Sequence, residues 1–239
     1  MPSLGDHLLV ALIAVAYPLF FTVGWFRSGR SRLETGEADS RRRFYYQSMI
    51  ELWLLTPLAI AWWLGSGRAL SAVGLGLPGG WAFWGGAIVV VAIASGLGYQ
   101  VATVRASADA RAQVRKQFRG VSALMIPRGG GERRLWVGLS LTAGFCEEVL
   151  YRGYLLWYLM VWLPAPIAVF VSAVLFGMAH LYLGLGIGVV RATIVGVVLG
   201  AAYLLTGTLW VPIAIHAVVD VASGFTGSYA LEEGGLRGG

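Results

Sequence analysis

Residues 135–160 read LWVGLSLTAGFCEEVLYRGYLLWYLM, and this stretch decides the fold. It is long and apolar enough to cross a bilayer as one helix, which requires about 20 residues. Near its middle it carries Glu147, Glu148 and Arg152. A charged side chain at the bilayer centre costs at least about 2.5 kcal/mol, so such residues are retained where they line a hydrated cavity and act there. The stretch therefore predicts a membrane helix that carries a polar site.

The composition of the whole chain is that of a helical membrane protein. Of its 239 residues, 57% are hydrophobic and 13% are charged, whereas soluble domains average about 25% charged residues. Helices satisfy their own backbone hydrogen bonds in lipid. We therefore predict an all-α, polytopic transmembrane bundle that forms one integral membrane domain over residues 1–239.

Apolar runs separated by polar or Gly- and Pro-rich connectors predict about seven spans. An eighth, re-entrant segment is left open. Residues 106–118 form either a basic amphipathic helix on the membrane surface or a solvated loop. The polar, Gly-rich residues 226–239 are expected to be a flexible C-terminal tail. The spans are expected at residues 8–26, 44–64, 81–104, 135–160, 165–183, 185–205 and 209–225.

The formal net charge of +6 comes from basic residues that gather in two loops. Six lie within residues 27–43 and eight within residues 105–134. The positive-inside rule places both loops in the cytoplasm. This accounts for the charge without nucleic acid, and the expected partners are membrane lipids and a membrane-associated peptide or protein substrate. One lysine among the 18 basic residues is typical of a GC-rich genome, which favours a bacterial plasma membrane.

Ionisable residues are concentrated in the last four expected spans. Glu148 and Arg152 are four residues apart, so they can pair on one helix face, which leaves Glu147 about 100° around the helix and free to face a cavity. His216 and Asp220 have the same spacing, which allows the carboxylate to orient the imidazole. The residues are Glu147, Glu148, Arg152, His180, Arg191, His216 and Asp220.

One glutamate and two histidines from three helices are suited to activating water. Glu147 would be the general base, His180 would relay the proton, and His216 with Asp220 would stabilise an oxyanion. Glu147, His180 and His216 are also a possible zinc-binding set, so a divalent metal is left open. Two roles are open for Arg191. It pairs with a substrate carboxylate, or it pairs with an acidic residue or snorkels within the bundle.

Spacing alone fits an intramembrane hydrolase and a proton-coupled transporter or channel equally well. In a transporter, Glu147, His180 and Asp220 would form a proton relay. Such proteins often contain inverted repeats with paired broken helices, and none is evident in this sequence.

Three segments carry a resemblance to a known family. CEEVLYRGYL, SAVLFGMAHL and IAIHAVVD match a signature of Glu-Glu-x-x-x-Arg, Phe-x-x-x-His and His-x-x-x-Asn or Asp. In these motifs the sequence resembles the type II CAAX prenyl endopeptidases and bacteriocin-processing membrane proteins, also called the CPBP or ABI family. The resemblance covers residues 136–225, which we interpret as a CPBP-like catalytic core.

The resemblance implies an intramembrane protease with a conical cavity that faces the cytosol. In the family, the first glutamate of the pair and the histidine of the second motif activate water, which here are Glu147 and His180. The third motif stabilises the oxyanion through His216 and Asp220, and Glu148 and Arg152 are the supporting pair.

The third motif ends in Asp220 where an asparagine would donate a hydrogen bond. An ionised aspartate cannot donate one. Three roles are therefore open for Asp220. It is protonated and donates, it orients His216, or it helps to bind a metal.

The resulting hypothesis is an endopeptidase that hydrolyses a peptide bond of a membrane-associated substrate, either prenylated or cleaved near its C-terminus. In a bacterium, maturation of a peptide or processing of a membrane protein is favoured over a prenylated substrate. The alternatives are a proton-coupled transporter or channel and a non-catalytic immunity or scaffold protein of the same fold.

Overall fold

The computed structural model describes residues 1–35, 38–118 and 120–232. Helices joined by short connectors make up these residues, and no β-strand occurs among them. The prediction of an all-α bundle is therefore confirmed. Arg119 of the second basic loop and residues 233–239 of the expected tail lie outside the described residues.

The helices include four π-helical and two 3₁₀ segments, which are labelled η. In chain order they are α1 (Leu4–Ala11), π-helix η1 (Leu12–Ala16), α2 (Tyr17–Gly24), π-helix η2 (Trp25–Gly29), α3 (Arg30–Glu34), α4 (Ala38–Gly65), 3₁₀ helix η3 (Leu70–Val73), α5 (Gly80–Ala106), α6 (Ala108–Arg115), α7 (Val121–Met125), α8 (Gly129–Glu148), π-helix η4 (Val149–Leu155), α9 (Leu156–Met160), α10 (Ala165–Ala179), 3₁₀ helix η5 (Leu181–Leu183), π-helix η6 (Leu185–Val190), α11 (Arg191–Thr206) and α12 (Trp210–Leu231).

Among the described residues, five helical stretches have the length and apolar composition needed to cross a membrane. The chain is therefore an integral membrane protein. Helix α10 is shorter than these spans, and the continuous segment from α8 to α9 carries the charged motif around Glu147. The count of seven spans stays a prediction. The five stretches are Leu4–Arg27, Asp39–Gly65, Gly80–Ala106, Gly188–Thr206 and Trp210–Leu231.

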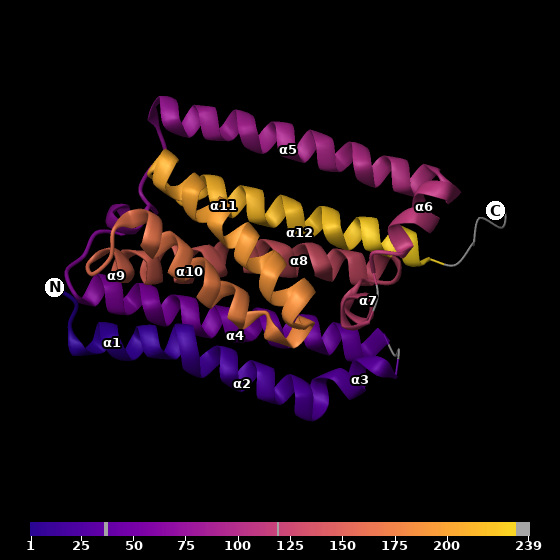
Figure 1. The fold of residues 1–239 in the computed structure, drawn as a ribbon, viewed down its shortest axis with the longest axis horizontal. Coiled ribbons are helices and arrows are strands. Elements are labelled where there is room, and N and C mark those ends of the chain that lie inside the picture. The colour runs from indigo at the N-terminus through magenta and orange to yellow at the C-terminus, as the bar shows by residue number, and fades with distance from the viewer. Residues whose placement is uncertain (36–37, 119, 233–239) are drawn as a thin grey trace.

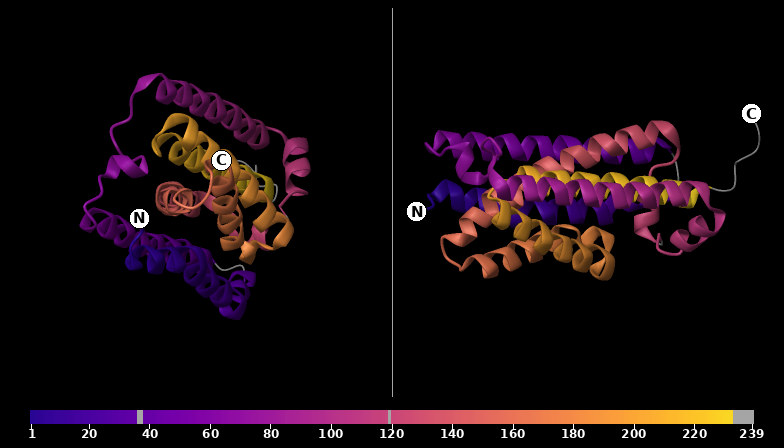
Figure 2. Two further views of the ribbon diagram at one scale, coloured as in Figure 1. Left: turned by 60° about the vertical axis from the view of Figure 1, so that its left-hand side comes forward. Right: turned by 90° about the horizontal axis from the view of Figure 1, so that it is seen from above.

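Helix α5 lies at the edge of the bundle, where it packs along α12 (Figures 1 and 2). Helix α8 lies between α4 and α12 and contacts both of them. Helix α10 packs against α11. The acidic pair of α8 therefore lies on a helix that packs against α12, which carries His216.

The second basic loop is partly helical. Helix α6 begins after Ser107, whose side-chain oxygen accepts a hydrogen bond from the Ala110 amide at 3.2 Å. This N-cap explains why the helix starts at this point. Helix α6 packs against α12 within the bundle. Of the two expectations for residues 106–118, the structure shows the helix, and its contact with lipid headgroups stays a prediction.

The last helix is longer than the sequence predicts. Residues 226–231 were expected to belong to the tail, but α12 continues through them to Leu231. Arg115 Nε donates to the Ala230 carbonyl at 2.7 Å and Arg128 Nη1 donates to the Leu231 carbonyl at 3.1 Å. Arginines stabilise the unpaired carbonyls and the negative end of a helix in this way. The loop between α5 and α8 therefore supplies the C-terminal cap of α12.

One end of the molecule contains α3, α6, α7 and the C-terminal end of α12 (Figure 1). We call it the basic end. There, Arg41 at the start of α4 forms a buried ion pair with Glu132 of α8, with Nε 2.8 Å from Oε2 and Nη2 3.1 Å from Oε1. The Arg128 amide also donates to Glu132 at 2.6 Å. This two-pronged pair fixes the start of α4 against the start of α8.

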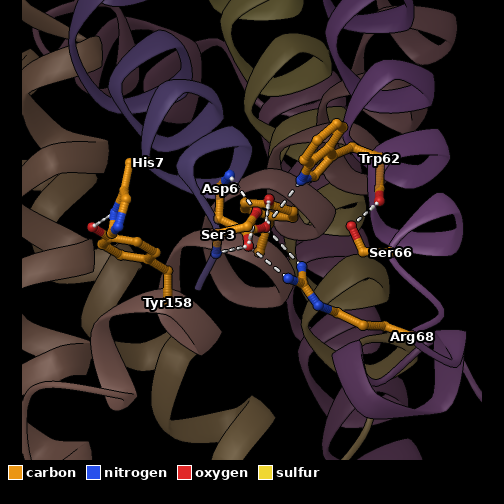
Figure 3. A network of polar contacts seen from close by, with 8 residues as sticks. Ser3, Asp6, His7, Trp62, Ser66, Arg68 and Tyr158 are labelled. Atoms are coloured by element: carbon orange, nitrogen blue, oxygen red, sulfur yellow. Dashed lines mark hydrogen bonds and ion pairs between the residues drawn. The ribbon is translucent and has the colours of Figure 1, made fainter. Parts of the chain in front are cut away.

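The opposite end is held by the fully buried carboxylate of Asp6 (Figure 3). Arg68 donates to its two oxygens at 2.7 and 2.6 Å, and Trp62 Nε1 donates at 3.1 Å. The Tyr154 hydroxyl donates to the same carboxylate. The guanidinium of Arg68 also lies over the Trp157 ring, 4.5 Å from its centroid. This network joins α1, the connector after α4, and the segment from η4 to α9.

We expect Asp6→Ala to lower the stability of the folded protein by about 3 kcal/mol, because it leaves the Arg68 charge without its partner. The measurement is thermal unfolding of the purified protein in detergent. His7→Ala is the matched control, because His7 is exposed and bonds only the Tyr158 side chain, at 2.7 Å. Equal melting temperatures for the two variants would show that the Asp6 network contributes nothing.

Candidate active site

The helix that carries the acidic pair changes its winding directly after Glu148. Helix α8 ends there, and the π-helix η4 contains Arg152. Short π-helical segments within α-helices occur frequently at functional sites. Arg152 Nη1 donates to Glu148 Oε1 at 2.9 Å, and the two side chains are 1% and 0% exposed. The structure thus brings together the pair that the spacing predicts.

The same oxygen of Glu148 also holds His216. The Nδ1 atom of His216 donates to Glu148 Oε1 at 2.8 Å. A carboxylate that also binds an arginine is an acceptor, so Nδ1 carries the proton. The Nε2 atom on the other side of the ring lies 3.8 Å from Glu147 Oε2 and 3.6 Å from Asp220 Oδ2.

Asp220 therefore does not supply the hydrogen bond that orients His216. That bond comes from Glu148, while Asp220 lies on the side of the opposite ring nitrogen. The spacing within α12 identifies Asp220 as a neighbour of His216, but it carries no information about the contact between α8 and α12.

The close approach of α8 and α12 depends on Gly144. A Cβ atom at this position would lie 3.0 Å from both the Cβ and the backbone nitrogen of Ala217, and 3.1 Å from the Ile213 carbonyl oxygen. Glycine lets the two backbones approach within the membrane. Trp136 of α8 also donates to the Asp220 carbonyl at 2.8 Å. These contacts place the acidic pair opposite His216.

His180 follows the last residue of α10, and its side chain folds back onto that helix. Its Nδ1 atom lies 2.9 Å from the Phe176 carbonyl oxygen. Because a carbonyl can only accept, Nδ1 is the donor, and Nε2 of the neutral ring is an acceptor. The ring therefore has a fixed orientation and one nitrogen that can accept a proton.

Phe176 has a larger structural role than its sequence position suggests. Its ring centroid lies 4.7 Å from that of His180 and 6.1 Å from that of His216. The guanidinium of Arg152 lies 4.2 Å from the same centroid. The phenylalanine of the second motif thus contacts the members of the other two motifs. The sequence motif marks this residue but does not show that it spaces the two histidines.

Tyr182 is a site residue that the sequence reasoning missed. Its ring stacks on that of His180, with centroids 5.9 Å apart and an interplanar angle of 27°. It lies two residues after His180 in η5, so a search for residues adjacent to the motifs would have found it.

Glu147, His180, His216 and Asp220 all line one cavity of about 540 Å³. Most of the remaining wall is apolar and aromatic. It is contributed by segments from the first helix to the last, including Tyr17, Phe44, Trp136, Tyr151 and Tyr182.

The two adjacent glutamates have different environments. The Glu148 side chain is fully buried and bonded, whereas that of Glu147 is 18% exposed. The Oε2 atoms of both glutamates have no hydrogen-bond partner among the described residues. Buried carboxylate oxygens are normally hydrogen-bonded to protein or to water. Only Glu147 lines the cavity, so it is the residue of the pair that is placed to bind a water molecule or a polar substrate group there.

Glu147, His180 and His216 are the set left open for zinc, and they have the donor types that zinc prefers. Among the described residues, no group of three or more His, Cys, Asp and Glu side chains is placed to hold a metal ion. Nδ1 of each histidine is bonded to protein, which leaves the two Nε2 atoms as the nitrogens that a metal would use. A divalent metal at this site stays a prediction.

Residues 131–222 match the family model described as type II CAAX prenyl endopeptidase Rce1-like. In this segment the chain resembles that family. Comparison with curated proteins and with solved structures gave no match. The resemblance predicted from the three motifs is confirmed, and the matched segment overlaps the catalytic core expected at residues 136–225.

The Rce1-like segment begins within α8, ends within α12 and contains the three motifs. The walls of the cavity extend beyond this segment. Tyr17 and Phe44 of the first helices and Leu97 and Gln100 of α5 also line it. The three motifs are therefore inside the family match, while part of the cavity wall lies outside it.

We expect Gly144→Val to destabilise the protein by about 1–3 kcal/mol, because its side chain would collide with the backbone of α12. Gly138→Val on the same helix is the matched control, since a Cβ there meets only Met49 Sδ, at 3.7 Å. Thermal unfolding of both variants in detergent provides the comparison. A Gly144→Val protein as stable as the Gly138→Val protein would contradict the close contact.

Proposed function

We propose that this chain is an intramembrane endopeptidase that hydrolyses a peptide bond of a membrane-associated substrate. The observation that supports the proposal is that Glu147, whose Oε2 atom accepts no hydrogen bond from the described residues, lines the same cavity as both site histidines. The match of residues 131–222 to a CAAX protease family model supports hydrolysis rather than transport.

In the proposed reaction, a water molecule bound by Glu147 attacks the substrate carbonyl carbon while Glu147 takes its proton. The new C–O bond forms as the carbonyl π electrons move onto oxygen. When the intermediate collapses, the C–N bond breaks, and Glu147 returns the proton to the leaving amine. This is general base followed by general acid catalysis by one carboxylate. The Nε2 atom of His180 accepts a hydrogen bond from the water and orients it.

His216 is proposed to stabilise the oxyanion. Its Nδ1–H bond to Glu148 leaves Nε2 directed toward the cavity, between Glu147 and Asp220. As an imidazolium it can donate from Nε2 to the developing negative charge. Glu148 and Asp220 both stabilise that cation electrostatically. This gives Asp220 a role that does not require it to donate a hydrogen bond.

The orientation in the membrane is part of the proposal. Trp25, Leu33 and Met125, from the basic end, form one buried cluster with Tyr182 and Leu183, which follow His180. The site is therefore nearer to the basic loops than to the Asp6 network. By the positive-inside rule, the basic end and the adjacent part of the cavity face the cytosol.

We expect Glu147→Gln to reduce cleavage at least about 100-fold, because the amide cannot act as the general base. The protein should remain folded, since Glu147 forms no hydrogen bond that the described structure needs. The measurement is quantitative mass spectrometry of new termini in membranes that contain the wild-type or the variant protein.

Glu34→Gln is the control for loss of a carboxylate, because Glu34 pairs with Arg30 on the surface. If the Glu147→Gln and wild-type proteins produced the same termini, the proposed role of Glu147 would be wrong. Proton flux into liposomes that depends on Glu147, in the absence of cleavage, would instead support the transporter.

Removal of divalent metal ions is expected to leave the cleavage rate unchanged, because Glu147 and the histidines activate water without a metal in this proposal. The test is cleavage by the purified protein before and after incubation with a chelator, followed by addition of Zn²⁺. Activity that the chelator abolishes and zinc restores would show that the site binds a metal during catalysis.

A further inference from the structure

Three serines line the cavity between the acidic pair and the basic end, and we call them the serine layer. They are Ser48 of α4, Ser140 of α8 and Ser223 of α12. Ser140 lies seven residues before Glu147, which is about 10.5 Å along α8 toward the basic end. Ser223 lies seven residues after His216 on α12. Seven residues are close to two helical turns, so each serine shares a helix face with a residue of the site.

Contacts between the helices place the serine layer at one depth in the bundle. A Cβ atom on Gly138 of α8 would lie 3.7 Å from Met49 Sδ of α4. These two residues are within two positions of the serines on the same helices. A Cβ atom on Gly224 of α12 would collide with the Trp136 ring of α8, and Gly224 directly follows the serine of α12. The three serines therefore lie within about one helical turn of the same level.

The hydroxyl of Ser140 is buried without a partner. This residue is 1% exposed, and its Oγ atom has no hydrogen-bond partner among the described residues. Hydroxyls elsewhere in the long helices are bonded within their own helix. Thr103 and Thr206 each donate to the carbonyl oxygen four residues earlier, at 2.9 and 2.7 Å. An unpaired buried hydroxyl lowers the stability of a fold, and a group that enters the cavity would supply the missing partner.

We propose that the serine layer binds the main chain of an extended peptide substrate, about three residues before the bond that is hydrolysed. The proposal rests on the proposed peptidase function and adds a binding subsite to it. An extended chain advances about 3.3 Å per residue. About three residues therefore cover the ~10.5 Å along α8 between Glu147 and Ser140.

A peptide main chain needs such partners in an apolar cavity. Each residue other than proline brings an N–H donor and a carbonyl acceptor, and burial without a hydrogen bond is costly for both. A serine hydroxyl can donate and accept, so it can bond to either group whatever the substrate side chain is. A lipid acyl chain has neither group and would leave Ser140 unpaired. The serine layer therefore favours a polypeptide over a lipid.

The bound segment is the one that continues into the cytosol. The serine layer lies on the side of the acidic pair that leads to the basic end, which faces the cytosol in the proposed orientation. A substrate that is cleaved near its C-terminus has most of its chain before the cleaved bond. That part of the chain would pass the serine layer on its way from Glu147 to the cytosol.

The test measures the binding of two peptides to the full-length Glu147→Gln variant in nanodiscs. The peptides have the same sequence, with a farnesylated cysteine directly before the expected cleavage site. In one of them an ester replaces the third amide before that site, which removes one N–H donor and weakens the adjacent carbonyl acceptor. We expect the all-amide peptide to bind about fivefold more tightly, because one hydrogen bond is weakened or lost with the ester.

The Glu147→Gln, Ser140→Ala double variant is expected to bind the two peptides with a ratio of about one, because alanine offers no hydroxyl. Glu147→Gln, Ser172→Ala is the matched control and should keep the fivefold ratio. Ser172 is also buried, but it lies outside the cavity wall and donates to the Tyr151 carbonyl at 3.1 Å.

Thermal unfolding in detergent gives a second readout that needs no substrate. Ser140→Ala alone should unfold at a temperature no lower than the wild-type protein, because its hydroxyl makes no bond within the described structure. Ser172→Ala should unfold at a lower temperature, since it loses a buried hydrogen bond. An equal decrease for both variants would show that Ser140 has a structural role and would overturn the proposal.

The outcomes separate this proposal from the proposed function. A preference for the all-amide peptide that Ser140→Ala removes supports the serine layer even if the wild-type protein cleaves neither peptide, and only the peptidase function would then fail. Equal binding of the two peptides to Glu147→Gln, or no binding of either, would overturn the serine layer. So would an equal loss of binding of both peptides with Ser140→Ala, because the hydroxyl would then bind water rather than the substrate main chain.

Discussion

The arrangement of the site depends on one buried carboxylate oxygen that accepts hydrogen bonds from both Arg152 and His216. Glu148 Oε1 is bonded to Arg152 at 2.9 Å and to His216 at 2.8 Å. Removing either partner would leave a charge in a low-dielectric interior, which is far more costly than the pair itself is worth. Because the three groups come from α8, η4 and α12, their contact fixes the register of α12 on α8. Glu147, the proposed general base, is thereby positioned by its neighbour Glu148.

Glu147 and Glu148 show how two identical side chains acquire different environments. Successive residues of a helix point about 100° apart, so only one of them faces α12 and its histidine. The other is directed into the cavity, where one oxygen has no partner among the described residues. The difference between the two glutamates arises from the tertiary structure, because it depends on which face of α8 packs against α12. Gly144 determines that meeting by allowing the two backbones to approach.

The sequence predicts the helices and much of the site, since both depend on local patterns. Hydropathy locates apolar helices because each helix satisfies its own backbone in lipid, and spacing identifies the Glu148–Arg152 pair because its members are one turn apart. The bond from His216 to Glu148 joins residues of different helices, so the spacing pointed instead to Asp220. The extension of α12 to Leu231 depends on Arg115 and Arg128, which are distant in sequence. No local pattern in residues 226–231 shows that these caps exist.

These polar contacts also explain how a cavity can persist in a membrane protein. Lipid tails are as apolar as leucine, so there is little hydrophobic force to hold helices together within the bilayer. Here α1, α4 and η4 are joined at one end by Asp6, and α4, α8 and α12 are joined at the other by arginines of the basic end. Between these ends, Glu148 fixes α8 against α12. With the helices held at three levels, the apolar walls do not need to collapse onto one another, and the cavity stays open beside Glu147 and the two histidines.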